Sequence, residues 1–239
     1  MIACPGCAAC GQKRDVLRVL PLCGPCARKL ACLNIPARGY CPACLSRLSR
    51  AGRCRACASK KPLIDRTFAP FLYQGVVRGL VIALKFNGDL RAAPLLSSAM
   101  NRALAARDCD LVVPVPRSKA RERERGFNQA ALIAAPIADA LGAPLLDLLE
   151  RTKNTKRQSS LRGTAARHKN VDGAFRAKAS IQGRRVLLTD DVRTSGATAN
   201  ACARALLDAG AKRVTLLVAA VAPNAGRAQR KYTWKERLT

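Results

Sequence analysis

The chain has 239 residues, 49% of them hydrophobic, and its 43 Lys and Arg residues against 15 Asp and Glu residues give a formal net charge of +28. This length and apolar content suffice for one α/β domain with a small extra module, which argues against a disordered chain. No apolar run approaches the ~20 residues of a membrane-spanning helix and no signal peptide precedes the first cysteines, so we expect a cytoplasmic protein without a membrane span.

The excess of positive charge predicts attraction to polyanions that weakens as the salt concentration rises. A generally basic composition is the competing interpretation. Two zinc ions, each held by four thiolates, would lower the net charge only from +28 to about +24. Metal binding therefore leaves the excess in place.

The cysteines gather at the start of the chain, where ten of the 12 lie within the first 57 residues. Eight form Cys-x-x-Cys pairs: Cys4/Cys7, Cys23/Cys26, Cys41/Cys44 and Cys54/Cys57. Two such pairs supply the four ligands of a tetrahedral zinc ion, so we predict two structural zinc sites, the first pair combining with the second and the third with the fourth. An interleaved pairing of the four Cys-x-x-Cys motifs stays open. Cys10 competes with Cys4 as a ligand of the first zinc ion, because Cys7/Cys10 has the same spacing. A redox-active dithiol is the alternative chemistry for such motifs.

Large apolar residues are few between these pairs, so metal has to replace a core there. Residues 58–66 contain proline and charge without an apolar period. We therefore predict a double zinc ribbon over residues 1–60 and a second domain over residues 61–239. The second domain alternates strands and helices, which is typical of a parallel sheet flanked by helices: strand 67–73, helix 76–86, helix 90–106, strand 111–116, helix 130–141, strand 145–149, a short helix in 161–170, strand 186–189, helix 199–208 and strand 214–222.

The most informative stretch is residues 186–198, where a strand runs into two acids, a Thr/Ser/Gly turn and a helix. The start of a helix offers unpaired N–H groups and a positive dipole end, which together favour phosphate. Gly196 allows close approach of the backbone, and Asp190 and Asp191 can accept hydrogen bonds from the hydroxyls of a ribose. The stretch thus indicates a site for ribose 5-phosphate, although an ordinary strand with a Ser/Thr helix cap would look similar.

Basic residues follow the strand that ends at Pro116. Arg117 and Arg125 are candidates for binding a diphosphate, whereas the arginines between them are typical of a solvated helix start. Residues 151–160 are predicted to form a polar, basic loop. His168 is more typical of a surface position than of a catalytic one. The tail from residue 223 mixes aromatic and basic residues, which can stack on bases and hold phosphates. The candidate nucleic-acid contacts are Arg125, Lys153, Lys156, Arg157 and Arg167.

Several blocks in order resemble the ComF family of bacterial competence proteins: the four Cys-x-x-Cys pairs, residues 84–88, 113–116, 123–129, 151–153, 158–175 and the stretch 186–198. The resemblance implies a double zinc ribbon followed by a type I phosphoribosyltransferase fold that binds phosphoribosyl pyrophosphate (PRPP) with Mg²⁺. The implied contacts are Asp190 and Asp191 on the ribose hydroxyls; Val192 and Arg193 beside them; Thr194, Ser195, Gly196, Ala197 and Thr198 on the 5-phosphate; and Val115, Pro116 and Arg117 on the diphosphate. Arg193 departs from an apolar position in the family, and Ser195 from the commoner Thr.

The resemblance further implies handling of single-stranded DNA in the cytoplasm during natural transformation, with other competence proteins as partners. The alternative is a phosphoribosyltransferase in which a base or amine displaces diphosphate from carbon 1, assisted by Mg²⁺ and Arg117 and needing no protein nucleophile. No catalytic residue follows from the sequence. A third hypothesis is an interaction protein with a vestigial pocket.

Overall fold

A parallel β-sheet forms the centre of the computed structural model, which describes residues 6–12, 21–35, 39–59, 62–117, 126–152, 171 and 173–222. The strand order is β1-β7-β6-β3, with the short β2 also paired to β7, and all these pairings are parallel. The strands are β1 (Arg66–Phe68), β2 (Phe71–Leu72), β3 (Leu111–Pro114), β6 (Arg185–Arg193) and β7 (Arg213–Val221). A separate antiparallel pair joins β4 (Leu149–Arg151) to β5 (Phe175–Ala177).

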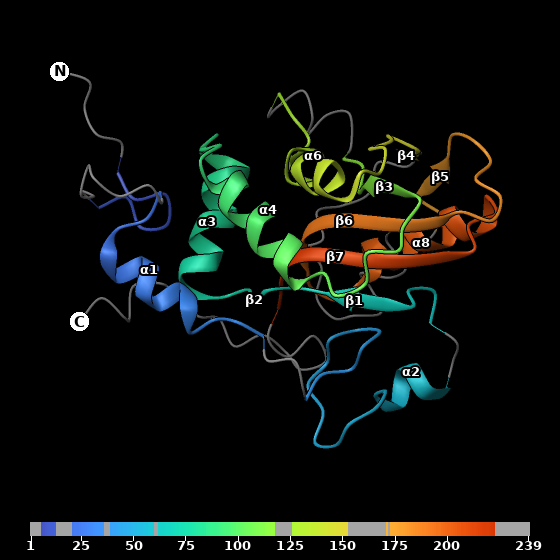
Figure 1. Ribbon diagram of the computed structural model, residues 1–239, viewed down its shortest axis with the longest axis horizontal. Coiled ribbons are helices and arrows are strands. Elements are labelled where there is room, and N and C mark those ends of the chain that lie inside the picture. Colours follow the sequence, from blue (N-terminus) through green and yellow to red (C-terminus); the bar gives the residue numbers. More distant parts are fainter. Residues whose placement is uncertain are drawn as a thin grey trace.

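Helices cover both faces of the sheet, as expected for a parallel sheet buried on both sides. One face carries α3 (Gly75–Phe86), α4 (Ala92–Ala103) and α6 (Gln129–Leu141), and the other carries α8 (Ala197–Asp208) (Figure 1). The alternation of side chains along β6 sets this division, because Leu187 packs with the first group of helices while Val186 and Leu188 pack with α8. Among the described residues no helix combines the length and apolar character that crossing a bilayer requires.

The expected α/β architecture is confirmed, with local differences. The strand predicted at 67–73 is divided into β1 and β2 around Ala69 and Pro70, since proline has no N–H to donate to β7. The strand predicted at 145–149 is reduced to a bridge between Leu145 and Val112, and its end begins β4. The expected helix at 161–170 lies outside the described residues, and the sequence pattern did not indicate β5.

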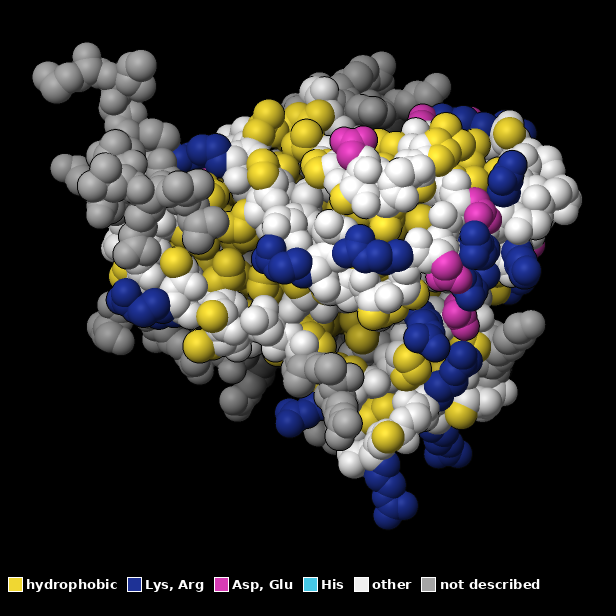
Figure 2. Space-filling view, in the orientation of Figure 1, with side chains coloured by type: hydrophobic (Ala, Val, Ile, Leu, Met, Phe, Trp, Pro, Cys, Tyr) yellow, Lys and Arg dark blue, Asp and Glu magenta, His cyan; other side chains and the backbone are white. Residues whose placement is uncertain are grey.

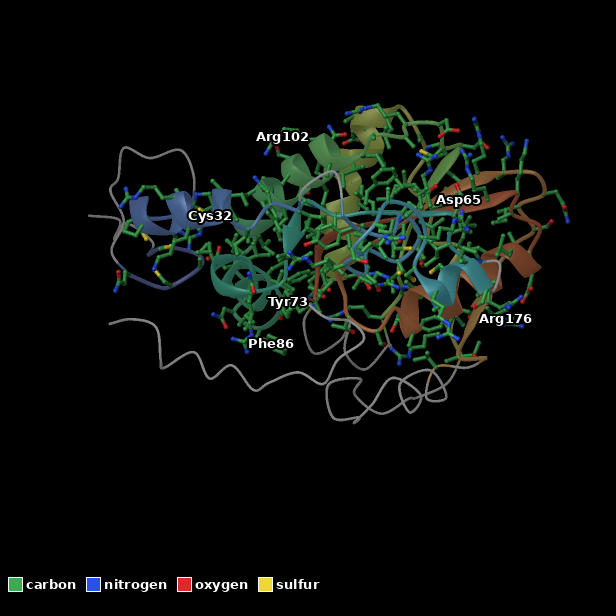
Figure 3. All side chains as sticks on the ribbon, turned by 90° about the horizontal axis from the view of Figure 1, so that it is seen from below. Cys32, Asp65, Tyr73, Phe86, Arg102 and Arg176 are labelled. Atoms are coloured by element: carbon green, nitrogen blue, oxygen red, sulfur yellow. The ribbon has the colours of Figure 1, made fainter. Side chains whose placement is uncertain are left out.

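The cysteine-rich segment divides into two modules. The first contains α1 (Gly24–Ala31) and lies beside α3, whereas the second contains α2 (Arg55–Ser59) and lies near β1 (Figure 1). In the view from below, Cys32 at the end of α1 and Asp65 before β1 lie toward opposite ends of the molecule (Figure 3). The domain boundary predicted near residue 60 stays a prediction. Cys7, Cys23 and Cys26 of the first module pack in the same hydrophobic core as α3.

Close backbone contact holds the first module on α3. A Cβ added to Gly79, in the middle of α3, would lie 2.3 Å from the carbonyl oxygen of Ala9. Arg91 adds a second link, because it donates to the carbonyl of Gly6 at 3.1 Å while paired with Asp89. Gly79 is therefore needed for docking, although glycine disfavours the helix itself.

Gly79→Ala should destabilise the protein by about 1–3 kcal/mol, because the clash with the module outweighs a gain in helix propensity of about 1 kcal/mol. The expected result is a lower midpoint of chemical unfolding, together with faster reaction of the cysteines of the first module with a thiol reagent. The cysteines of the second module serve as the internal control. An unchanged or raised midpoint would contradict the docking contact.

Candidate ribose-phosphate site and cysteine groups

Two loops meet where β3 and β6 end, since Pro114 of β3 is the register partner of Thr189 of β6. The N–H of Val115 donates to the carbonyl of Thr189 at 2.9 Å, which extends the pairing one residue beyond β3. The side-chain amide of Asn128, which caps α6, donates to the carbonyl of Val115 at 3.1 Å. These bonds hold residues 115–117 next to the acids of β6, where the sequence predicts the diphosphate loop.

The second loop joins β6 to α8 and carries the predicted 5-phosphate residues. Gly196 precedes the helix with a φ of 78°, a left-handed conformation that favours glycine. The hydroxyl of Ser195 accepts a hydrogen bond from the N–H of Ala197 at 3.3 Å, and the first turn of α8 contains no acidic residue. The hydroxyl-bearing residues Thr194, Ser195 and Thr198 are partly exposed. An anion reaching this helix start meets N–H groups and hydroxyls, and the first turn of α8 itself adds no carboxylate.

The two acids have different environments. Asp191 is 6% exposed and forms a 2.6 Å ion pair with Lys85, near the end of α3. Asp190 is half-buried, and one of its carboxylate oxygens accepts the N–H of Asp191 at 2.8 Å. Burial and the neighbouring charge of Asp191 raise the pKa of Asp190 to about 7, although Lys85 and Arg117 oppose this rise. The effect of Arg117 on Asp190 indicates that the diphosphate loop and the acid pair share one electrostatic environment.

Lys85→Met should lower the free energy of unfolding by about 2 kcal/mol, because Asp191 is then left buried without its cation. The double variant Lys85→Met/Asp191→Asn should recover part of this loss, since it leaves no unpaired charge. Lys178→Met is the matched control, because its ion pair with Asp147 is exposed and should contribute less than about 1 kcal/mol. Equal losses in the two Lys variants, measured by chemical denaturation, would contradict a structural role for the Lys85 pair.

Arg193 lies at the end of β6, directly before the loop of residues 194–196 that carries predicted 5-phosphate contacts (the phosphate loop). Its side chain does not project toward solvent. It is 7% exposed, and its Nη1 donates to the carbonyl of Cys44 at 2.5 Å. The family resemblance places this residue beside the ribose contacts of Asp190 and Asp191. The observed side chain connects the end of β6 with the second cysteine module, and its place among the ligand contacts stays a prediction.

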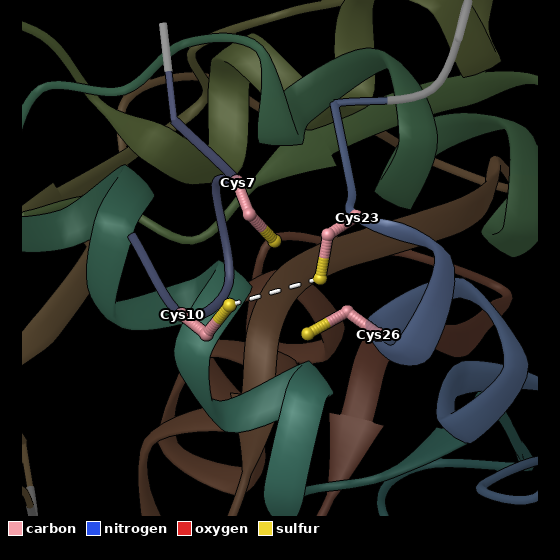
Figure 4. A group of neighbouring side chains, drawn as sticks. All are labelled: Cys7, Cys10, Cys23 and Cys26. Atoms are coloured by element: carbon pink, nitrogen blue, oxygen red, sulfur yellow. Dashed lines mark hydrogen bonds between the residues drawn. The ribbon is translucent and has the colours of Figure 1, made fainter. Parts of the chain in front are cut away.

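Eight of the described cysteines form two groups of four. Cys7, Cys10, Cys23 and Cys26 make the first, and Cys41, Cys44, Cys54 and Cys57 make the second; within each, the sulfurs lie within 4.8 Å of one another. The second group is the predicted one, and in the first group Cys7 combines with Cys23 and Cys26 as predicted. Figure 4 shows the first group converging on one point, with Cys10 and Cys23 Sγ 3.8 Å apart. Cys10 takes the place that the sequence gave first to Cys4, which lies outside the described residues.

The donor set suits a metal ion that prefers thiolates. Although burial opposes ionisation, N–H groups of Cys23, Ala9 and Cys10 lower the pKa of Cys7 to about 7. Backbone N–H groups lower the pKa of Cys41 to about 7 in the same way, whereas burial and neighbouring cysteines raise the pKa of Cys26 and Cys57. Tetrahedral clusters of four thiolates are typical of structural zinc. Each group could hold one zinc ion and, when filled, would leave no position open for a substrate.

Comparison with known proteins gives consistent matches. The phosphoribosyl transferase domain family matches residues 128–239. The DNA utilization protein YhgH of Salmonella typhimurium is 31% identical over 202 residues, covering 81% of this chain and 87% of that protein. Competence protein F of Haemophilus influenzae is 30% identical over 81% of this chain and 87% of that protein. Competence protein ComFC of Bacillus subtilis is 30% identical over 71% of this chain and 72% of that protein. This chain belongs to the ComF family.

The ComF-family chain has the type I phosphoribosyltransferase fold, a parallel sheet flanked by helices, with two four-cysteine groups consistent with an N-terminal zinc-ribbon module. Among solved structures, a glutamine PRPP amidotransferase of B. subtilis overlaps 51% of this chain and 24% of its own, with 24% identity and a TM-score of 0.34. That overlap is too small to carry a functional argument.

Sequence reasoning assigned no role to two site residues of this ComF-family chain, Lys85 and Asn128. Both lie in the blocks that carry the family resemblance, which was the available signal. The predicted nucleic-acid contacts lie outside the described residues, as does His168: Arg125, Lys153, Lys156, Arg157 and Arg167. Those contacts therefore stay predictions.

Proposed function

We propose that this ComF-family protein binds PRPP with Mg²⁺ at the shared edge of β3 and β6 and acts with single-stranded DNA during DNA uptake or utilization. The observation that carries the proposal is the meeting of three features at one edge: the anion-accepting start of α8, the acids at the end of β6, and Arg117, whose charge acts on Asp190. PRPP presents a monophosphate, a ribose diol and a diphosphate, which these three features complement in turn.

The relatives support the DNA part of the role, since their names assign them to DNA utilization and competence. Physical support comes from the net charge of +28. Exposed cations outnumber anions on the face shown in Figure 2 and project from the lower edge, where α2 lies. The second module carries Arg47, Arg50, Arg53 and Arg55, all exposed, and no acid between residues 39 and 59. We place this role in the cytoplasm, where thiols stay reduced and two zinc ions can be retained.

Calorimetric titration of PRPP with Mg²⁺ tests the ligand. Wild type should bind, and Asp190→Ala should bind at least about 10-fold more weakly, because the hydrogen bonds of a charged acceptor to the ribose are lost. This variant leaves the pair between Lys85 and Asp191 intact, so loss of folding is not expected. Asp147→Asn, at an exposed acid on another loop, should bind like wild type. No binding by wild type, or equal binding by all three proteins, would refute the proposed ligand.

Gel shifts with single-stranded DNA test the partner. Apparent affinity should fall steeply between 50 and 200 mM salt, roughly tenfold or more, because phosphate contacts release counterions. An affinity insensitive to salt would contradict an electrostatic interaction.

Transfer of the phosphoribosyl group is the second candidate, favoured by Arg117, whose charge lowers the pKa of Asp190 and could offset the charge of a leaving diphosphate. The reaction would break the bond between carbon 1 and the diphosphate and form one to a base or amine nitrogen. Diphosphate release in a screen of bases and amines distinguishes transfer from binding alone.

A further inference from the structure

Arg193 is a buried cation with an incomplete set of partners. At 7% exposure it retains its hydrogen bond to the carbonyl of Cys44, while its Nε is buried without a hydrogen-bond acceptor. Within the described part of the chain, no carboxylate pairs with it. A guanidinium removed from water needs a compensating negative charge nearby.

The second cysteine group lies next to the guanidinium, because the carbonyl that accepts the hydrogen bond of Nη1 belongs to Cys44, one of its four members. Four thiolates around one zinc ion carry a net charge of about −2, which a single buried cation offsets in part. The charge of Arg193 and that of a filled second group are therefore complementary.

The other side of the guanidinium faces the phosphate loop. A Cβ added to Gly196 would lie 2.6 Å from Nη2 and 3.0 Å from Cζ of Arg193. The absence of a side chain at Gly196 thus leaves the room that the guanidinium fills. Because Gly196 directly precedes α8, a shift of Arg193 would displace the backbone at the start of the helix.

The cysteine loop that Arg193 contacts is itself fixed to the sheet. The N–H of Thr67 in β1 donates to the carbonyl of Pro42 at 2.7 Å, and the Thr67 hydroxyl donates to the carbonyl of Ala43 at 2.7 Å. With the bond from Arg193 to Cys44, three consecutive carbonyls of this loop are held by the phosphoribosyltransferase-like part of the chain. A change in the cysteine group is therefore transmitted to the loop through a short, defined contact.

We propose that Arg193 is a positioning residue that couples the second four-cysteine group to residues 194–198, so that the metal-bound state of this group sets the geometry of the anion site. Loss of zinc, followed by protonation of the freed thiolates, would remove the charge that holds the guanidinium, and the loop would lose its support. The consequence for PRPP rests on the function proposed above, whereas the coupling itself is a property of the ligand-free protein.

A double-variant cycle measured by amide hydrogen exchange tests the coupling without any ligand. Cys57→Ser, which removes one ligand of the second group, should raise exchange of residues 194–198 by about tenfold, as should Arg193→Met. The combined variant should exchange no faster than either single variant, since both break the same link. Additive effects, or a loop unaffected by Cys57→Ser, would overturn the proposal.

Two controls separate coupling from general destabilisation. Cys10→Ser in the first group should combine additively with Arg193→Met, and Arg47→Met, at an exposed arginine of the second module, should leave the loop unchanged.

If Cys57→Ser fails to fold, zinc release from Arg193→Met decides the question. The second-group zinc should then be lost to a chelator about tenfold faster than from wild type, Arg193→Lys should restore part of the retention, and the first-group zinc should be unaffected. If Arg193→Met loses its second-group zinc no faster than wild type does, the coupling is overturned.

PRPP titration of the same variants reports the functional consequence. Wild type should bind PRPP more tightly than Arg193→Met, and Cys57→Ser should add no further weakening to that variant. If wild type does not bind PRPP, the proposed function fails while exchange and zinc release still decide the coupling. If wild type binds and the effects are additive, the coupling fails and the proposed function stands.

Discussion

Replacing Cys23 with serine should remove one of the two expected zinc ions and lower the thermal unfolding midpoint by about 10 °C or more. Cys23 lies in the first group and is 7% exposed within the core that α3 shares. Structural zinc contributes on the order of 10 kcal/mol to such modules, and even a 3 kcal/mol loss shifts the midpoint of a protein of this size by about 10 °C. Elemental analysis and calorimetric melting measure the two effects.

Cys32→Ser is the matched control for this experiment. Cys32 lies only nine residues further along the chain but is exposed and belongs to neither four-cysteine group. This variant should retain both zinc ions and melt like wild type. Equal zinc content in the Cys23 and Cys32 variants would contradict the assignment of the first group.

PRPP affinity should rise about tenfold between pH 6 and pH 8 through the ionisation of Asp190. Its folded pKa of about 7 lies above the value of about 3.9 in an unfolded chain. The stability contributed by the protonated group is therefore present below about pH 4 and is lost as the pH rises through 7. A ribose hydroxyl that donates to Asp190 favours the ionised form, so binding near pH 7 should release a proton.

Calorimetric titration in two buffers with different ionisation enthalpies counts that proton. Asp190→Asn can still accept a hydrogen bond through its amide oxygen but cannot titrate, so its binding should lack the proton release that Asp190 contributes. The phosphate groups of PRPP also titrate, and the variant controls for them because they are common to both measurements. The same proton count in wild type and variant would contradict a raised pKa at Asp190.

Local patterns in the sequence were sufficient to predict the architecture. The alternation of apolar strands and amphipathic helices predicted the parallel sheet, and the order of strand, acids, small residues and helix predicted the loop before α8. Both features depend on residues that are near one another in the chain. Their geometry follows from backbone rules alone, such as the left-handed conformation of Gly196.

The contacts between distant segments could not be predicted in the same way. The pair between Lys85 and Asp191 joins α3 to β6, and the bond from Arg193 to Cys44 joins β6 to the cysteine-rich segment. Nothing in the local pattern of Arg193 distinguishes a buried cation from a solvent-exposed one. Similarly, Cys4 and Cys10 have equal spacing from Cys7, and only the fold places Cys10 with the second pair.

Each cysteine module supports a different half of the proposed site. The first module packs on α3, the helix that ends beside Lys85 and thereby holds Asp191. The second module reaches the phosphate loop through Arg193. The two modules would therefore act on the proposed site through Lys85 and Arg193 respectively.

The central claim, that one edge of the sheet binds the monophosphate and the diphosphate of the same molecule, is tested most directly by comparing three ligands on the wild-type protein with Mg²⁺. Calorimetric titration with PRPP, ribose 5-phosphate and diphosphate should give an affinity for PRPP at least about 100-fold higher than for either fragment, because joining two fragments makes the second contact intramolecular. An affinity for PRPP no higher than that for ribose 5-phosphate would contradict the claim, since residues 115–117 would then contribute nothing to binding.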